Sequence, residues 1–220
     1  MFCIAGVLWL DYPLLVFLRS FDGLWARMID VVFSFKVWIA AVSVALAVQI
    51  IIKSKEQRAK SIDRERGSFV SYIKESTVKF KRVSNSALCS LLFALVLSGM
   101  VGWVLKVAIG RMRPVFFEAL DKVGFYPFTM DWAFNSMPSG HAVASFAGLV
   151  TIGLLHPRWK PLTWSLAILI GISRVAAGAH FPSDVLLGAF IGMACADIIA
   201  ALRQGEMKGQ KGKRVCGQKE

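Results

Sequence analysis

The sequence predicts an all-α integral membrane protein, a polytopic bundle of about six membrane helices. Three properties of the 220-residue chain favour this fold class: 56% of its residues are hydrophobic, only 18% are charged, and the mean hydropathy is +0.58. Soluble domains of this size carry about 25% charged and 45–50% apolar residues. The composition therefore excludes a disordered chain and disfavours an ordinary soluble domain.

The first hydrophobic element lies within residues 1–18 and is the least regular of the series. Asp11 and Pro13 interrupt it. It lacks the basic start and the small-residue cleavage site of a signal peptide. Two interpretations therefore stay open: a short first membrane span, or a helix that lies in the membrane interface.

Five further apolar segments can each form a membrane helix. About 20 apolar residues cross a bilayer, and 17 to 25 are usual. Two of the segments have 19 residues, and the shorter ones reach the required length if polar residues at one end lie among the lipid headgroups. In chain order the segments cover residues 37–52, 87–105, 141–155, 161–173 and 184–202.

The basic residues alternate with these segments. Of the 26 Lys and Arg side chains, 18 lie in residues 53–82, in residues 156–160 or in the tail from residue 203. These segments fall on one side of the membrane if every span crosses, and the positive-inside rule makes that side cytosolic. The net charge of +12 thus indicates a membrane protein and no nucleic-acid partner, because no single soluble basic face is built.

The chain divides into two parts on this interpretation. Residues 1–203 form a single membrane domain, and residues 204–220 form a basic tail whose composition predicts disorder. We expect residues 53–82 to be a solvated linker. The four cysteines are far apart in the sequence, so neither a disulfide framework nor a zinc site is predicted.

Three clusters of chemically active residues lie at the outward ends of the predicted spans. Charged and histidine side chains there are costly unless they are paired or functional. The clusters are Lys106 to Arg113-Pro114, then Pro138-Ser139-Gly140-His141, and then Ser173-Arg174 followed by His180 and Asp184.

The cations of these clusters are suited to binding a phosphate dianion. Lys106 and Arg113 are seven residues apart, so we expect them to share one face of a helix. Arg174 adds a third cation, and the guanidinium group offers forked donors to phosphate oxygens. Ser139 and Gly140 precede an apolar helix, whose free backbone N–H groups would bind an anion.

The histidines supply the groups that a phosphoryl transfer needs. His180 and Asp184 are four residues apart, and a helix that begins near Pro182 would let the carboxylate reach the imidazole. A carboxylate on one ring nitrogen leaves the other nitrogen as a nucleophile. His141, from a different span, is a candidate proton donor for the leaving oxygen.

Taken in order, the motifs K-x6-R-P, P-S-G-H and S-R-x5-H-x3-D resemble those of the type 2 phosphatidic acid phosphatase superfamily. They match at every fixed position, and the motif core runs from Lys106 to Asp184. The resemblance implies that His180 forms a phosphohistidine, that Asp184 orients it, and that His141 protonates the leaving oxygen and then activates water. It also implies that the phosphoryl oxygens are held by Lys106, Arg113, Ser139, Gly140 and Arg174.

The resemblance further implies a membrane lipid phosphatase with no metal and no other cofactor. The expected substrate is a lipid phosphate monoester or pyrophosphate of the lipid A, undecaprenyl pyrophosphate, phosphatidylglycerophosphate or phosphatidate class. The short loops suggest a bacterial protein of the cytoplasmic (inner) membrane, with its active site on the outer, periplasmic face. The oligomeric state is not indicated by the sequence.

Two other functions stay open. The same phosphohistidine would make the protein a lipid phosphotransferase if another lipid accepted the group. A non-enzymatic lipid transporter or scaffold is the alternative from a different class, and the intact histidines argue against it. We expect the loop 115–137 to select the substrate, and we interpret Arg111 as a basic anchor that extends toward the membrane surface.

Overall fold

The computed structural model describes residues 2–63, 70–116 and 124–216, and no β-strand occurs within these ranges. Two short 3-10 helices, η1 (Trp132–Phe134) and η2 (Pro157–Trp159), accompany the α-helices. The α-helices are α1 (Phe2–Arg19), α2 (Leu24–Val32), α3 (Phe35–Asp63), α4 (Val70–Ile109), α6 (Gly140–Leu155), α7 (Lys160–Ala176) and α8 (Pro182–Cys216). The all-α fold class is therefore confirmed.

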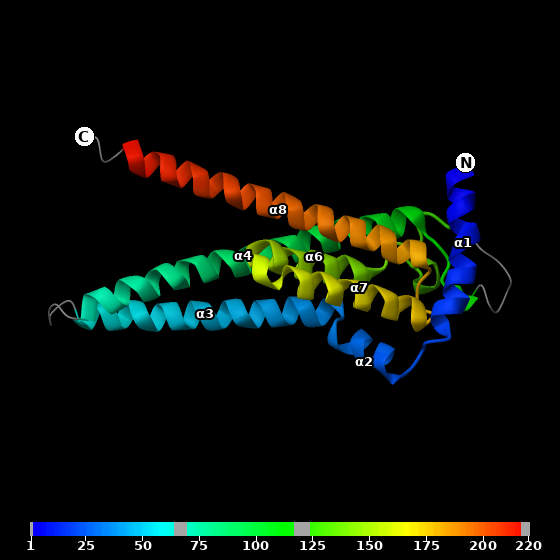
Figure 1. The fold of residues 1–220 in the computed structure, drawn as a ribbon, viewed down its shortest axis with the longest axis horizontal. Helices are drawn as coiled ribbons and strands as arrows, with labels where there is room; N and C mark the ends of the chain where they lie inside the picture. Colours follow the sequence, from blue (N-terminus) through cyan, green and yellow to red (C-terminus); the bar gives the residue numbers. More distant parts are fainter. Residues whose placement is uncertain (1, 64–69, 117–123, 217–220) are drawn as a thin grey trace.

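The long helices α3, α4, α6, α7 and α8 run along the bundle, whereas α1 lies across one end of it (Figure 1). The crosswise direction of α1 agrees with the interfacial interpretation of the first hydrophobic element. Pro13 lies inside α1. The charged side chain of Asp11, on the same helix, is buried. The number of helices that cross a membrane stays a prediction.

The basic segments lie at the end of the bundle opposite α1. The last turns of α3 and α8 and the first turns of α4 are found there in Figure 1. Two expectations differ from the structure at this end. Helices α3 and α4 extend through most of residues 53–82, the expected linker, and α8 continues as helix through residues 204–216 of the expected disordered tail. Both stretches are rich in Lys, Arg, Glu and Gln, which are strong helix formers; residues 64–69 and 217–220 lie outside the described ranges.

Helix α6 forms the centre of the bundle and contacts α3, α4, α7 and α8. Eleven of its sixteen residues are buried. Many of them are small, including Ala142, Ala144, Ala147 and Gly148. Small side chains let helix backbones approach closely, which is how membrane helices associate when burial of apolar surface supplies little driving force.

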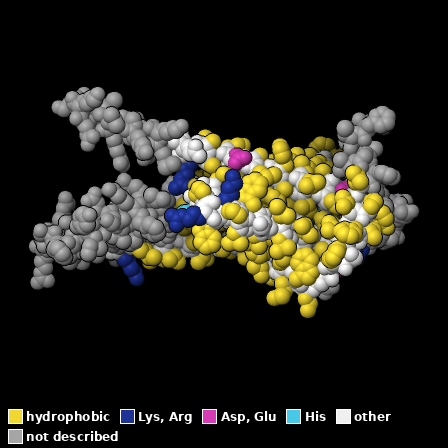
Figure 2. All heavy atoms as spheres, viewed as in Figure 1, with side chains coloured by type: hydrophobic (Ala, Val, Ile, Leu, Met, Phe, Trp, Pro, Cys, Tyr) yellow, Lys and Arg dark blue, Asp and Glu magenta, His cyan; other side chains and the backbone are white. Residues whose placement is uncertain are grey.

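The face of the bundle seen in Figure 2 is largely apolar between its two ends. Large hydrophobic side chains point outward from α4 and α8, such as Phe93 at 64%, Leu186 at 70% and Phe190 at 67% exposure. Two helical stretches, Ala87–Ile109 and Pro182–Gly205, are long and apolar enough to cross a membrane. A surface of this kind is expected to contact lipid, because soluble proteins rarely expose large continuous apolar areas.

Two glycines of α8, Gly188 and Gly192, set how closely α8 packs on α6. A Cβ atom at Gly192 would lie 2.7 Å from the backbone nitrogen of Ala147 and 2.7 Å from the carbonyl oxygen of Val143. One at Gly188 would lie 2.8 Å from the carbonyl oxygen of Ser139. This four-residue spacing of small residues is typical of closely packed membrane helices, and it holds the starts of α6 and α8 side by side.

We predict that Gly192→Ala destabilises the fold by about 1–3 kcal/mol, because the methyl group must separate two backbones. The matched control is Gly205→Ala on the same helix, where an added Cβ meets no atom within 4 Å. Alanine there should be neutral or stabilise by roughly 0.5–1 kcal/mol. Thermal unfolding in detergent micelles measures both variants, and equal midpoints would contradict the close-packing interpretation.

Candidate active site

The end of α4 is determined by Gly110. This residue has φ +58°, and a Cβ atom there would lie 1.8 Å from the carbonyl oxygen of Tyr126, so only glycine fits. Beyond it the chain is extended, and Arg111 forms an isolated antiparallel bridge with Phe125. The expectation that Lys106 and Arg113 share a helix face is therefore wrong, because the helix ends between them.

Backbone hydrogen bonds hold residues 124–136 against the extended segment that follows α4. Tyr126 N donates to Gly110 O at 2.7 Å, and Arg113 N donates to Ala133 O at 3.0 Å. Ser136 N donates to Arg111 O at 3.0 Å. This ladder fixes the position of Arg113 without a helix and brings the loop over the end of the bundle.

Lys106 and Arg113 nevertheless converge on one point. Lys106 Nζ donates to the carbonyl oxygen of Asn135 at 2.7 Å, and Arg113 Nη2 approaches the same oxygen at 3.5 Å. The Arg113 guanidinium also donates from Nε to Trp132 O at 3.1 Å and lies 4.3 Å from the centre of the Trp132 ring. The side chains of Lys106 and Arg113 thus point toward the same position, which is occupied by the carbonyl oxygen of Asn135.

The first turn of α6 contributes Ser139, Gly140 and His141. Ser139 is the fully buried N-cap residue, its Oγ has no hydrogen-bond partner, and its backbone N–H donates to Asp184 O at 2.9 Å. The backbone N–H groups of a first helical turn have no partners within the helix and favour an anion. His141 follows Gly140 in this turn and is half-buried.

Arg174 is the third predicted cation and lies in the last turn of α7, where it is 5% exposed. Burial lowers the pKa of Arg113, the positive charge of Arg174 lowers it further, and Asp184 raises it. The two guanidinium groups are therefore close enough to repel each other. An anion bound between them would relieve that repulsion.

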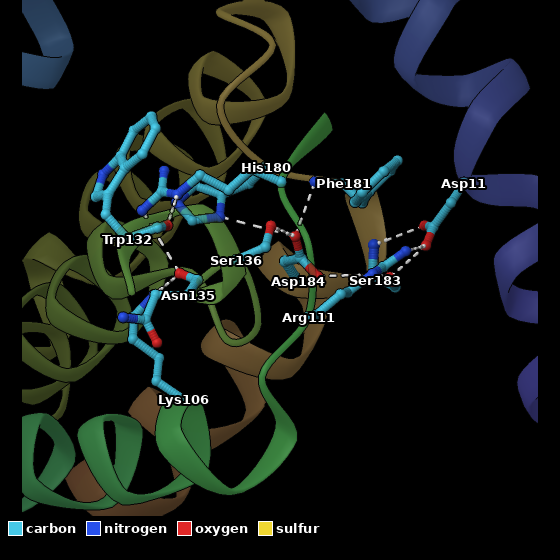
Figure 3. A network of polar contacts seen from close by, with 11 residues as sticks. Asp11, Lys106, Arg111, Trp132, Asn135, Ser136, His180, Phe181, Ser183 and Asp184 are labelled. Carbon is cyan, nitrogen blue, oxygen red and sulfur yellow. Dashed lines mark hydrogen bonds and ion pairs between the residues drawn. The ribbon is translucent and has the colours of Figure 1, made fainter. Parts of the chain in front are cut away.

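His180 and Asp184 come together as expected. Helix α8 begins at Pro182, and its first turn places Asp184 Oδ2 3.7 Å from His180 Nδ1 (Figure 3). Burial lowers the pKa of His180 from 6.5 to about 3; the carboxylate opposes this, while Lys106 and Arg113 lower the pKa further. The imidazole is therefore neutral near pH 7, which is the form that can act as a nucleophile.

The carboxylate of Asp184 is completely buried and accepts several hydrogen bonds. Its Oδ2 accepts from Ser136 Oγ at 2.5 Å and from Phe181 N at 2.9 Å. Its Oδ1 accepts from Arg111 Nη1 at 2.6 Å. The interpretation of Arg111 as a membrane-surface anchor is thus wrong: its side chain is 1% exposed and pairs with carboxylates inside the protein.

Four residues of the site were missed by the sequence reasoning: Asp11, Arg111, Asn135 and Ser136. Asp11 carried a signal, because a charged residue within an apolar segment predicts a paired or functional side chain. Arg111 carried a weaker one, because it lies between the motif residues Lys106 and Arg113. Asn135 acts through its backbone carbonyl and Ser136 through a single hydroxyl. No spacing rule points to either.

The loop expected to select the substrate is described only in part, since residues 117–123 lie outside the described ranges. Its described aromatic residues are mostly exposed, with Phe128 at 82% and Trp132 at 60%. The residues that the structure describes contain no group of three or more His, Cys, Asp or Glu side chains arranged to hold a metal ion.

A cavity of about 240 Å³ adjoins the cationic site between α4 and α6. Its wall is mainly apolar, with Lys106 and Gly140 at the end that faces the site. It is lined by Gly99, Gly102, Trp103, Lys106, Pro138, Gly140 and Val143. An apolar chain attached to a phosphate bound at Lys106 would have a place to lie here.

Comparisons with known proteins show which family the sequence belongs to. A family model described as the PAP2 superfamily matches residues 87–208. The chain is 42% identical over 102 residues to a lipid A 1-phosphatase of Rhizobium johnstonii, which is 46% of this chain and 42% of that protein. It is 32% identical over 117 residues to an undecaprenyl-diphosphatase of Sulfolobus acidocaldarius, 51% of this chain and 53% of that protein. The chain therefore spans about half the length of these relatives, or less.

A search of solved structures finds the crystal structure of Aquifex aeolicus LpxE. The alignment has a TM-score of 0.45 and 21% sequence identity, and it covers 86% of this chain and 94% of that one.

We predict that His180 stays neutral in the ligand-free protein from pH 7 down to about pH 5. Its folded-state pKa is lowered to about 3 by burial, so protonation begins only well below the ordinary pKa of 6.5. NMR of protein with isotope-labelled imidazole rings measures the charge, with His180→Gln to assign the signal. A midpoint near 6.5 for His180 would contradict the buried, neutral state.

Proposed function

Because the chain belongs to the PAP2 superfamily, we propose that it is a membrane lipid phosphatase that hydrolyses a lipid phosphate monoester or pyrophosphate through a phosphohistidine. One observation carries the proposal. Two cations, Lys106 and Arg113, converge on a single oxygen atom, and a neutral His180 held by Asp184 lies within the electrostatic reach of both.

In the first step, the Nε2 atom of His180 attacks phosphorus. The N–P bond forms as the bond from phosphorus to the leaving oxygen breaks. His141 donates a proton to that oxygen, which departs as an alcohol or as a lipid phosphate. Asp184, 3.7 Å from Nδ1, stabilises the positive charge that develops on the imidazole.

In the second step, His141 removes a proton from water, and the water oxygen attacks phosphorus. The N–P bond breaks, inorganic phosphate leaves and His180 is neutral again. Lys106, Arg113, Arg174, the unpartnered hydroxyl of Ser139 and the backbone N–H of Gly140 hold the nonbridging oxygens through both steps. Such fixed donors act strongly because they need no reorganisation as charge develops.

The substrate is expected to be a lipid because the site opens into the apolar cavity between α4 and α6. The similarity to a lipid A 1-phosphatase makes the 1-phosphate of lipid A the first substrate to test. Undecaprenyl pyrophosphate, phosphatidylglycerophosphate and phosphatidate follow. We place the site on the periplasmic face of a bacterial inner membrane, because the basic segments lie at the opposite end of the bundle.

The function is tested by phosphate release from a panel of these four lipids with purified protein. We predict that His180→Gln lowers turnover by about 10⁴-fold or more, as loss of a nucleophile does. The matched control is His156→Gln, an exposed histidine between α6 and α7, which should keep full activity. A folded His180→Gln variant with near-normal turnover would reject the mechanism, and phosphorylated lipid in place of free phosphate would indicate a phosphotransferase.

The cavity is tested by filling it. We predict that Gly102→Leu raises KM for a long-chain lipid phosphate by about tenfold or more, roughly what 1.4 kcal/mol of lost binding gives. A short-chain soluble phosphate ester should be hydrolysed as before. The control is Val104→Leu on the same helix, where the side chain is 56% exposed. Equal effects on the long and short substrates would show that the lipid chain does not lie in this cavity.

A further inference from the structure

The buried guanidinium of Arg111 lies between two carboxylates from opposite ends of the chain. Its Nη2 is 2.8 Å from Asp11 Oδ2 on α1, and its Nη1 is 2.6 Å from Asp184 Oδ1 on α8. All three side chains are at most 5% exposed. Figure 3 shows Arg111 reaching Asp11 on one side and Asp184 on the other.

The contact of Arg111 with Asp184 determines which oxygen faces His180. Arg111 occupies Oδ1, so Oδ2 is left for Ser136 Oγ, Phe181 N and the imidazole. A rotation of the carboxylate would break the bonds to Arg111 and Ser136 together. Arg111 therefore restrains the carboxylate from the side opposite His180.

Asp11 in turn holds both Arg111 and the start of α8. Its Oδ1 accepts from Ser183 N at 2.9 Å, and its Oδ2 accepts from Ser183 Oγ at 2.5 Å. Ser183 immediately precedes Asp184, and its Oγ also lies 2.6 Å from Arg111 Nη1. The aromatic ring of Phe181 covers Arg111 with a centroid distance of 4.1 Å.

The charges of this cluster do not cancel. Two carboxylates share one guanidinium, so Arg111 compensates only part of the charge of Asp184. The remaining negative charge faces His180, whose imidazole becomes positive when it attacks phosphorus. Asp11 thus has two effects: it holds Arg111 in place, and it limits how far Arg111 neutralises Asp184.

We propose that Arg111, anchored by Asp11 of the crosswise helix α1, is a positioning residue that orients Asp184 and, through it, the nucleophile His180. This inference rests on the proposed phosphatase function. Arg111 does not hold the phosphate: its three nearest polar groups are Asp11, Ser183 and Asp184, and it acts on the reaction only through the carboxylate.

The test compares Arg111→Gln and Asp11→Asn with the wild-type protein in phosphate release. Arg111→Gln should lower kcat by about 10²-fold, the effect of a small misplacement of a reacting group. Asp11→Asn should lower kcat by about tenfold, because the guanidinium keeps its second carboxylate. KM should stay within about threefold in both, since the phosphate-binding cations are intact. The matched control, Asp22→Asn, changes an exposed carboxylate just beyond α1 and should have no effect.

A double variant separates positioning from a merely structural role. If Arg111 acts through Asp184, adding Arg111→Gln to Asp184→Asn should lower kcat no further than Asp184→Asn does alone. Independent, multiplied losses would overturn the proposal, as would full kcat in folded Arg111→Gln. If Arg111→Gln does not fold, Arg111→Lys and the isosteric Asp11→Asn decide the question by the same kcat and KM criteria.

The outcome also distinguishes this inference from the proposed function. Wild-type protein that releases no phosphate from any lipid of the panel would reject the function, and the role of Arg111 with it. Active wild type together with fully active Arg111→Gln and Asp11→Asn would reject the positioning role alone.

Discussion

The structure depends on one buried carboxylate, that of Asp184. Taking a carboxylate out of water costs several kcal/mol unless it is paired and hydrogen-bonded. Here Arg111 after α4, Ser136 in the loop and Phe181 before α8 all donate to it, and its backbone oxygen accepts from Ser139 at the start of α6. Asp184 therefore connects the three segments that carry the motifs proposed to be catalytic. The need to pair its buried charge determines how these segments meet.

The positive charges that cluster around this carboxylate favour the binding of an anion. At one end of the bundle, burial and the charge of Arg174 lower the pKa of Arg113, whereas Asp184 raises it; the charge of Arg113 likewise lowers the pKa of Lys106. A phosphoryl group would supply the missing negative charge. Clustering of like charges is typical of functional sites, where the ligand provides what the fold leaves unbalanced. The same burial that makes the cations unfavourable lowers the pKa of His180 and keeps its imidazole neutral, as the proposed nucleophile requires.

The architecture of the bundle is compatible with the proposed lipid substrate. Its sides expose large hydrophobic groups, its polar site lies at one end, and a mainly apolar cavity lies beside Lys106. Close packing at Gly188 and Gly192 keeps the first turns of α6 and α8 together, so the site is built on rigid helix ends. Helix α1 lies across this end and reaches the site through Asp11, although almost the whole chain separates Asp11 from Asp184.

The amino-acid sequence by itself determined the all-α class and the order of the apolar helices, and it supplied the motifs on which the proposed phosphate-binding and histidine roles rest. These are local properties: hydrophobic runs, the charge of the connections, and short spacings such as that from His180 to Asp184. Only the tertiary structure showed that the turn at Gly110 brings Arg113 close to Lys106. Only the tertiary structure showed that Arg111 is buried. It alone also added Asp11, Asn135 and Ser136 to the site. The physical reason is that the partner of a buried charge or hydroxyl is set by which distant segments pack together, and no short-range pattern in the chain encodes that contact.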